Sequence, residues 1–177
     1  MALTKVIGSG IGTVTNQFAD GNMSAGSVVQ VVHVQDGAAA TGTTTIPWDN
    51  TIPQITEGTE FLTLAITPTS ATNKLLIEAA VINNCSANTI AVTMALFVGT
   101  TANALASILC SLDNVANRAA NVSPLVHFMT AGVTTELTFR IRLGGHGSST
   151  ISVNADGSNS LYGGTAASTI TITEIAV

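Results

Sequence analysis

The sequence predicts an all-β protein, an antiparallel β-sandwich of jelly-roll type that carries an extended N-terminal arm. Apolar and polar residues alternate with a period of two in several stretches, and clusters of Gly, Asn, Ser and Pro separate them. No stretch shows a sustained helical period. We expect roughly eight to ten strands, the number found in a jelly roll or a related sandwich.

The length of 177 residues suits one sandwich with a sizeable core plus a modest extension. Residues 1–26 are rich in glycine and have no regular periodicity, so we interpret them as an arm that docks on a partner. Residues 27–177 are expected to form the β-sandwich, or knob domain.

The clearest strand is predicted over residues 135–143, where large apolar residues alternate with charged and polar ones. Residues 89–98 alternate in the same way and predict a long half-buried strand. Residues 28–34 and 75–82 are apolar on both faces, which is typical of strands that are covered on both sides. These two stretches supply the candidate interface or packing residues Val29, Val31 and Ile77.

Residues 44–66 contain the single Trp, two Ile-Pro steps, an acidic turn and then an alternating strand. A residue before proline favours an extended conformation, so this stretch predicts a corner without helix. We expect it to join the arm and the first strand to the regular knob. Trp48 is accordingly interpreted as packing at this junction, within or between subunits, in preference to a sugar-stacking platform.

Charged residues make up 8% of the chain, against about 25% in ordinary soluble domains. Hydrophobic residues make up 46%, so the surface must be covered largely by small polar side chains. Such a surface predicts an obligate assembly. The net charge of −5 and the scattered basic residues argue against nucleic-acid binding, and no segment has the pattern of a signal peptide or a membrane-spanning helix.

No catalytic, cofactor or metal site is predicted. The histidines His33, His127 and His146 show no metal-binding spacing, although one inward His33 or His127 repeated around a three-fold axis would still allow an ion site. Glu57 and Glu60 fall in a turn, which favours solvated carboxylates over a glycosidase pair. We therefore expect no enzyme.

Two further expectations concern the cysteines and the tips of the knob. Cys85 and Cys110 lie far apart in the sequence and are interpreted as small buried thiols that do not pair. The turns over residues 144–149 and 154–160 are rich in Gly, Asn and Ser. They supply the candidate exposed tip residues, which are His146, Asn154, Asp156 and Asn159.

Three phrases carry a resemblance to a known family: LTKVIGSGIGTVTNQFADGNMSAGSVVQVV, TTTIPWDNTIPQITEGTEFLTLAITPTSATNKLLIEAA and LYGGTAASTITITEIAV. The chain resembles the small β-sandwich structural proteins of tailed bacteriophages. The resemblance implies a virion protein assembled in the host cytoplasm, a homotrimeric short tail fibre that docks on other virion proteins through residues 1–26. Its knob would face a host surface glycan or protein. The alternatives are a capsid decoration protein and, from another class, a lectin-like carbohydrate-binding domain.

Overall fold

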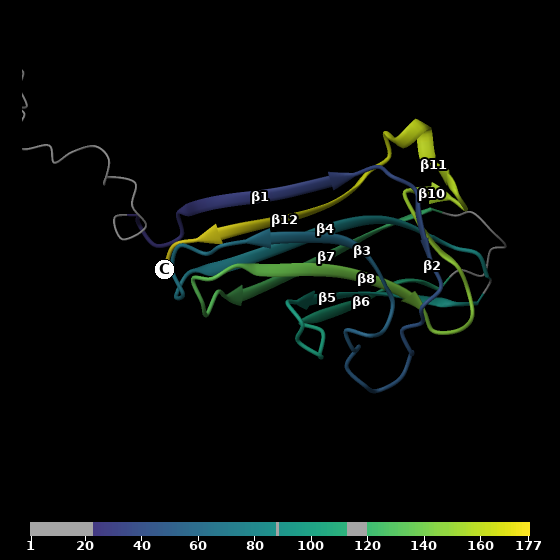
Figure 1. Cartoon of the computed structure of the whole chain (residues 1–177), viewed down its shortest axis with the longest axis horizontal. Helices are drawn as coiled ribbons and strands as arrows, with labels where there is room; N and C mark the ends of the chain where they lie inside the picture. The colour runs from purple at the N-terminus through teal and green to yellow at the C-terminus, as the bar shows by residue number, and fades with distance from the viewer. Residues whose placement is uncertain (1–22, 88, 113–119) are drawn as a thin grey trace, which may run out of the picture.

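The computed structural model describes residues 23–87, 89–112 and 120–177, and it confirms the predicted antiparallel β-sandwich of jelly-roll type (Figure 1). Most of the predicted docking arm, residues 1–22, lies outside the described residues. Two main sheets pack face to face, and every strand pairing is antiparallel.

Sheet I has six strands. β12 pairs with one edge of β4, and β7 pairs with the other edge. β1 pairs with β12. β9 pairs with the C-terminal end of β4 and also with β2. The bounds are β1 (Val28–Asp36), β2 (Ala40–Gly42), β4 (Lys74–Cys85), β7 (Asn121–Thr130), β9 (Ile151–Val153) and β12 (Ser168–Ile175).

Sheet II has four strands in the order β3-β8-β5-β6. Their bounds are β3 (Thr59–Ile66), β8 (Leu137–Gly145), β5 (Ala91–Val98) and β6 (Ala106–Leu112). A small hairpin of β10 (Ala155–Asp156) and β11 (Asn159–Ser160) and a 3-10 turn, η3 (Leu161–Gly164), precede β12. The predicted turn at residues 154–160 is thus a hairpin.

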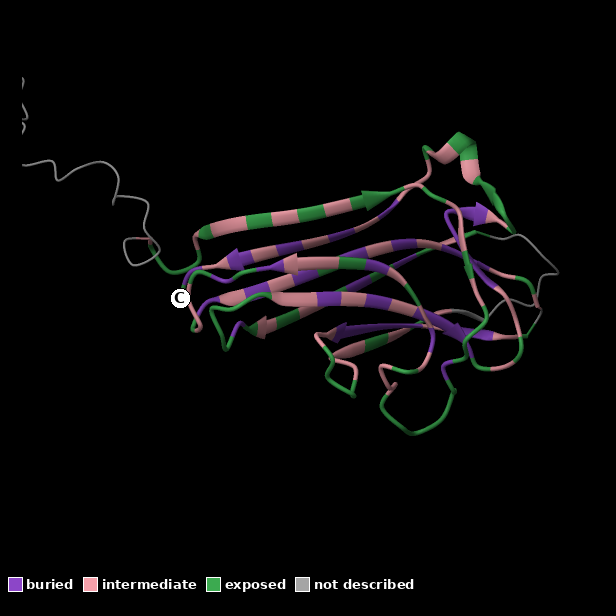
Figure 2. Cartoon of the chain, in the orientation of Figure 1, coloured by how far each residue is buried: buried purple, intermediate pink, exposed green. Residues whose placement is uncertain are grey.

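The core lies between the two sheets. Leu75, Ile77 and Val81 of β4 are fully buried against Phe139 and Ile141 of β8, and the alternation predicted for both strands is confirmed. Buried residues alternate with less buried ones along β12 as well, which gives the banding in Figure 2. Each methylene group in this layer contributes about 0.8 kcal/mol of burial free energy.

The segment over residues 43–58 covers the outer face of sheet II. Ile46 is fully buried there and packs on Ala95 and Phe97 of β5. A Cβ on Gly144 would lie 2.7 Å from the backbone N of Ile46 and 2.7 Å from the backbone O of Thr44, so only glycine permits this close approach. The prediction of a half-buried strand over residues 89–98 is wrong in this respect, because both faces of β5 are buried.

The corner over residues 44–66 is not the entry to the domain. β1 precedes it and is already part of sheet I, where it pairs with β12 along its length. The extended conformation that Pro47 and Pro53 favour serves instead to run the chain across sheet II before β3 begins.

A buried carboxylate fixes one end of the sandwich. Glu174 of β12 is fully buried and accepts hydrogen bonds from the side chains of Gln30, Thr69 and Asn73 and from the backbone N–H of Thr69 and Ser70. Burial alone would raise the pKa of Glu174, but the hydrogen bonds from Gln30, Asn73 and Thr69 together hold that pKa below its ordinary value. The carboxylate therefore ties β1, β12 and the turn before β4 together.

Candidate assembly interface

The outer face of sheet I carries several large apolar side chains that are exposed within the protomer. Strand register places Phe128 of β7 beside Leu76 of β4, and Val126 beside Glu78. Val122 lies two rows further along, beside Ile82, and Pro124 lies beside Ala80 in the row between. The alternate residues of both strands point into the core.

β7 forms one edge of this face and carries its largest exposed side chains. Val122 is 64% exposed, Val126 is 62% exposed and Phe128 is 55% exposed, whereas Leu125 on the same strand is buried. Pro124 lies between them on the outward side, where an edge strand tolerates its missing N–H. β7 is thus apolar on both faces although only one face is covered.

The other half of the face is formed by β12 and β1 and is polar but uncharged at its centre. Thr169, Thr171 and Thr173 alternate with buried residues of β12, and the Nδ1 atom of His33 lies 2.8 Å from the Oγ1 atom of Thr171. A shallow depression of about 320 Å³ lies between the two halves. Its lining residues are Glu78, Ala79, Ala80, Pro124, Val126, Thr169 and Thr171.

Charge is scarce on this face. Within β1, β4, β7 and β12, which are described in full, Glu78 is the one charged side chain that points outward from the middle of the sheet. Lys74 lies at the end of β4 and donates a hydrogen bond to the Oγ1 atom of Thr130. Covering the face would therefore desolvate few charged groups.

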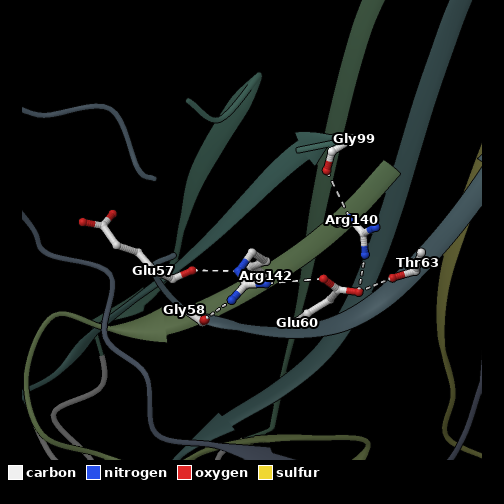
Figure 3. Close-up of polar contacts among 7 residues, drawn as sticks. All are labelled: Glu57, Gly58, Glu60, Thr63, Gly99, Arg140 and Arg142. Atoms are coloured by element: carbon white, nitrogen blue, oxygen red, sulfur yellow. Dashed lines mark hydrogen bonds and ion pairs between the residues drawn. The ribbon is translucent and has the colours of Figure 1, made fainter. Parts of the chain in front are cut away.

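The outer face of sheet II is different, because it holds an ionic network (Figure 3). Glu60 accepts hydrogen bonds from Arg140 at 2.9 Å, from Arg142 at 3.3 Å and from Thr63 at 2.6 Å. Arg142 also donates to the carbonyl oxygens of Glu57 and Gly58, each at 2.8 Å. These charged groups have partners within the protomer, so they need none from another copy of the chain.

The predicted interface residues fall in three different places. Val31 points outward from β1 on the outer face of sheet I and is largely exposed, and Val29 lies at a β-bulge next to it. Ile77 is fully buried in the core between the sheets. Trp48 lies on the side of sheet II, 61% exposed, so it is not a lid on the protomer's own core.

Two predictions about strand covering are affected by this geometry. β1 was expected to be covered on both sides, but it is an edge strand and Val31 is exposed within the protomer. Residues 75–82 were expected to be covered on both sides as well, but on the outer face of β4 Glu78 is exposed and Leu76 is only partly buried.

The residues of β7 were not predicted as interface residues. The signal was available, because Val122, Val126 and Phe128 share one face while Leu125 and Met129 share the other.

The predicted tip residues do not form one site. His146 is exposed in the turn after β8 and contacts Trp48, whereas Asp156 and Asn159 are paired in the β10–β11 hairpin. The expectation that Asn154 is exposed is wrong, since its side chain is buried. Its Nδ2 donates to the carbonyl oxygen of Asp36 at 2.7 Å, and its Oδ1 accepts from the hydroxyl of Ser168 at 2.6 Å.

The other reactive side chains are dispersed. In the described ranges no group of three or more His, Cys, Asp or Glu residues could hold a metal ion. His127 points inward from β7, and burial lowers its pKa. Cys85 and Cys110 are both free thiols. Burial raises the pKa of Cys110, although hydrogen bonds with Ser123 and with the backbone of Met94 oppose the shift.

Among the residues that the structure describes, none belongs to a helix of the length and hydrophobicity needed to span a membrane.

Comparison with known families gives one assignment. The family model described as the Pgp3 C-terminal domain matches residues 44–177, which is most of the chain. The chain belongs to this family. The resemblance to tailed-bacteriophage structural proteins is therefore wrong, and so is the virion location that it implied, because the family that matches is the Pgp3 C-terminal domain and not a phage protein family. The low-charge, threonine-rich strands that suggested a phage protein are general features of an assembling β-sandwich.

The family match begins at residue 44, whereas the sandwich of this chain begins earlier. β1 and β2 come from residues before the match and pair with β12 and β9 inside it. The part of sheet I that the Pgp3 C-terminal domain family model does not cover is therefore one edge of the candidate interface.

Solved structures give weaker matches. The VP2 subviral particle of infectious bursal disease virus is 14% identical, with a TM-score of 0.38 over 84% of this chain and 38% of the VP2 chain. The Gt strain of the same virus gives 11% identity and a TM-score of 0.41 over 87% of this chain and 39% of the other. Eiger TNF from S. frugiperda is 12% identical, with a TM-score of 0.40 over 82% and 93%. The chain thus spans about two fifths of the VP2 chains. No curated protein matches it.

Proposed function

We propose that this chain is a non-enzymatic assembly domain that forms a homotrimer through the outer face of sheet I. The observation that carries the proposal is the exposed apolar edge of that face, Val122, Val126 and Phe128, beside a sheet with almost no charge. Contiguous exposed apolar side chains of this size mark protein interfaces.

The free energy available supports a stable contact. Fully burying a Val or Phe side chain contributes about 1.5–3 kcal/mol. The three β7 side chains are about 55–64% exposed, so covering them contributes roughly 3–5 kcal/mol for each copy. Leu76 and Ile82 of β4 lie in the same rows and add to this. An obligate interface of about 2,000 Å² would include the threonine half of the face as well.

The two edges of this surface fit a ring of copies. The apolar strip lies at one edge of sheet I, on β7, and a mixed strip lies at the other, where the threonines of β12 are next to the exposed Val28 and Val31 of β1. A ring places unlike surfaces of neighbouring copies against each other, and each copy then covers its neighbour's strip. Three copies are also consistent with the assignment to the Pgp3 C-terminal domain family.

The structural use of the acidic side chains supports a non-enzymatic role. The Oε2 atom of Glu57 accepts a hydrogen bond from the backbone N–H of Gln54 at 2.9 Å. Glu60 is bound by Arg140 and Arg142, and Glu174 is buried in its own cluster. Each of these carboxylates thus has a structural role, because it stabilises a turn or a strand.

The test is the molar mass of the chain in solution, measured by light scattering and sedimentation equilibrium. We expect a trimer for the wild type. The trimers of Val126→Glu and Phe128→Glu should dissociate at a protein concentration at least about a hundredfold higher than the wild-type trimer does. The reason is that an unpaired charge buried at an interface costs several kcal/mol.

The matched control is Leu109→Glu, the same kind of change on the outer side of sheet II, where Leu109 is also about half exposed. It should leave the mass unchanged. A monomeric wild type at micromolar concentration refutes the proposal, and so does equal dissociation of the Leu109 and Val126 variants.

A further inference from the structure

A groove on the opposite side of the sandwich carries a second, independent feature. It runs along the outer side of β6 and is walled by the loop over residues 47–53. Two adjoining depressions of about 170 Å³ and 310 Å³ share Thr51, Pro53 and Ser107. Either depression is of the order of a single sugar ring, and the two together are of the size of a small-ligand site.

An aromatic side chain lies at one end of this groove. Trp48 is 61% exposed, which leaves a large apolar surface in water. The indole is nevertheless held in place, since its ring centroid lies 5.8 Å from that of His146 in an edge-to-face arrangement. His146 is itself fixed, because its Nδ1 atom accepts a hydrogen bond from the backbone N–H of Ala91 at 2.8 Å. Trp48 is thus a positioned platform.

A carboxylate stands beside the platform. The Oδ1 atom of Asp49 accepts hydrogen bonds from the backbone N–H of Thr51 at 2.7 Å and from its hydroxyl at 2.6 Å. These hydrogen bonds, that of the side chain first, lower the pKa of Asp49 and keep it ionised. The second oxygen, Oδ2, is left to accept hydrogen bonds from a ligand. The hydroxyls of Thr93 and Ser107 lie along the same groove.

This set of groups selects the chemistry of the ligand. The lining residues that the structure describes include no Lys or Arg, and Asp49 repels anions, so phosphate, sulfate and acidic sugars are disfavoured. A metal ion would need more carboxylate or imidazole ligands than Asp49 alone. An aromatic face attracts the weakly positive C–H groups of a pyranose ring, and a carboxylate beside it accepts hydrogen bonds from neighbouring hydroxyls.

We propose that this groove binds a neutral saccharide, with one sugar ring stacked on Trp48 and its hydroxyls donating to Asp49. The ring would lie against Leu109 and Ile108, and the hydroxyls of Thr93 and Ser107 would bind its other polar groups. The groove is on the sheet II side of the molecule, away from the candidate assembly face. It therefore stays open whether or not the chain forms a trimer, and three copies would add avidity for a surface carrying many glycans.

The test begins with the full chain on an array that carries acidic glycans as well as neutral ones, the neutral glycans containing glucose, galactose, mannose and N-acetylhexosamines. The best of these glycans is then titrated in solution. Trp48 is the single tryptophan of the chain, so its fluorescence reports binding in the groove directly. We expect a saturable change in that fluorescence.

Trp48→Ala and Asp49→Asn should each weaken binding at least about tenfold, measured by calorimetry. The control is Tyr162→Ala, which removes another highly exposed aromatic side chain at a distant turn and should leave binding unchanged. Trp48→Phe keeps an aromatic face and should retain part of the affinity, which covers the case in which Trp48→Ala folds poorly. The molar mass of all four variants should equal that of the wild type.

Three results would overturn the proposal. They are no binding to any neutral glycan on the array, binding to acidic glycans alone, and binding that Trp48→Ala, Asp49→Asn and Tyr162→Ala weaken equally. None of these results bears on the trimer, which is tested by mass alone.

Discussion

Replacement of Glu174 should reveal how much of the stability depends on one buried carboxylate. In Glu174→Ala, the five hydrogen bonds that the carboxylate accepts are lost together. A buried donor left without a partner costs about 1–3 kcal/mol, but Thr69, Ser70 and Gln30 are close enough to the surface to bind water instead. Asn73 is buried, and a contact that remains to its Nδ2 atom is the long one to the Oγ1 atom of Thr69 at 3.3 Å. We therefore expect a loss of about 3–5 kcal/mol in the free energy of unfolding.

Glu174→Gln should cost less. The amide oxygen can still accept the hydrogen bonds from Thr69, Ser70 and Asn73, but the new NH₂ group then faces the NH₂ group of Gln30. Rotation of the Gln30 amide would relieve this contact at the expense of its hydrogen bond to the carbonyl oxygen of Thr67. We expect a loss of about 1–2 kcal/mol.

The assay is urea unfolding at pH 7 and at one fixed protein concentration, since assembly makes the apparent stability depend on concentration. The matched control is Glu136→Ala, which removes an exposed carboxylate from a turn and should change stability by less than about 0.5 kcal/mol. If Glu174→Ala and Glu136→Ala unfold at the same urea concentration, the argument for a structural carboxylate is refuted.

The pH dependence provides a second readout of the same cluster. The pKa of Glu174 is lowered in the folded state, so its contribution is fully present above the ordinary Glu value of 4.5 and is lost as the pH falls through the lowered folded value. Between pH 7 and pH 3 the wild type should lose more stability than Glu174→Gln, and the two unfolding curves should converge in acid. A constant difference between them would contradict the assignment.

Two further predictions concern the outer side of sheet II. Gly144→Ala should lower the free energy of unfolding, measured by urea unfolding, by about 2 kcal/mol or more, because its Cβ meets the backbone of Thr44 and Ile46. The control is Gly157→Ala, where a Cβ has open space and only the backbone angle is unfavourable. An equally small effect of the two substitutions would refute the close packing at Gly144. Arg142→Lys should cost about 1–2 kcal/mol, because lysine cannot donate at once to Glu60 and to two carbonyl oxygens. Arg140→Lys, which removes fewer contacts, should cost less in the same measurement, and a reversed order would count against the network in Figure 3.

The fold could be predicted because alternation reports the two-layer core directly. In β8, Phe139, Ile141 and Leu143 point inward and their neighbours point outward, as the sequence indicated. β12 and β4 follow the same rule. Alternation is a local property, so it is readable without knowing which strands pair.

Features that depend on contacts between segments far apart in the sequence could not be predicted from alternation. Both faces of β5 are buried because Ile46, far away in the sequence, packs on Ala95 and Phe97. Asn154 looks like a turn residue, and it does have a positive φ of 56°, but its side chain is buried by strand ends that the topology brings to it. Its exposure could not be judged from the turn composition alone.

The sequence predicted that the protein assembles, but it did not predict which surface forms the interface. The low charge indicated assembly, but composition does not say which sheet is exposed. Trp48 and Ile77 were selected as candidates because they are large and apolar, and the structure places the first beside a groove and the second in the core. Alternation along β7 separates Val122, Val126 and Phe128 from Leu125, but only the structure shows that the first set is the uncovered one.

The two outer faces of the sandwich differ in how many charged side chains they carry. Both arginines of the described strands are on sheet II, where Glu60 and two backbone carbonyl oxygens of the loop before β3 bind them. This network keeps one outer face hydrated and rigid, and the Trp48 groove lies on that same side. Sheet I retains Glu78 at the centre of its outer face and leaves β7 uncovered. Because a charged, internally satisfied face loses more on desolvation than an apolar one, assembly should cover sheet I and leave the groove on sheet II open to a ligand.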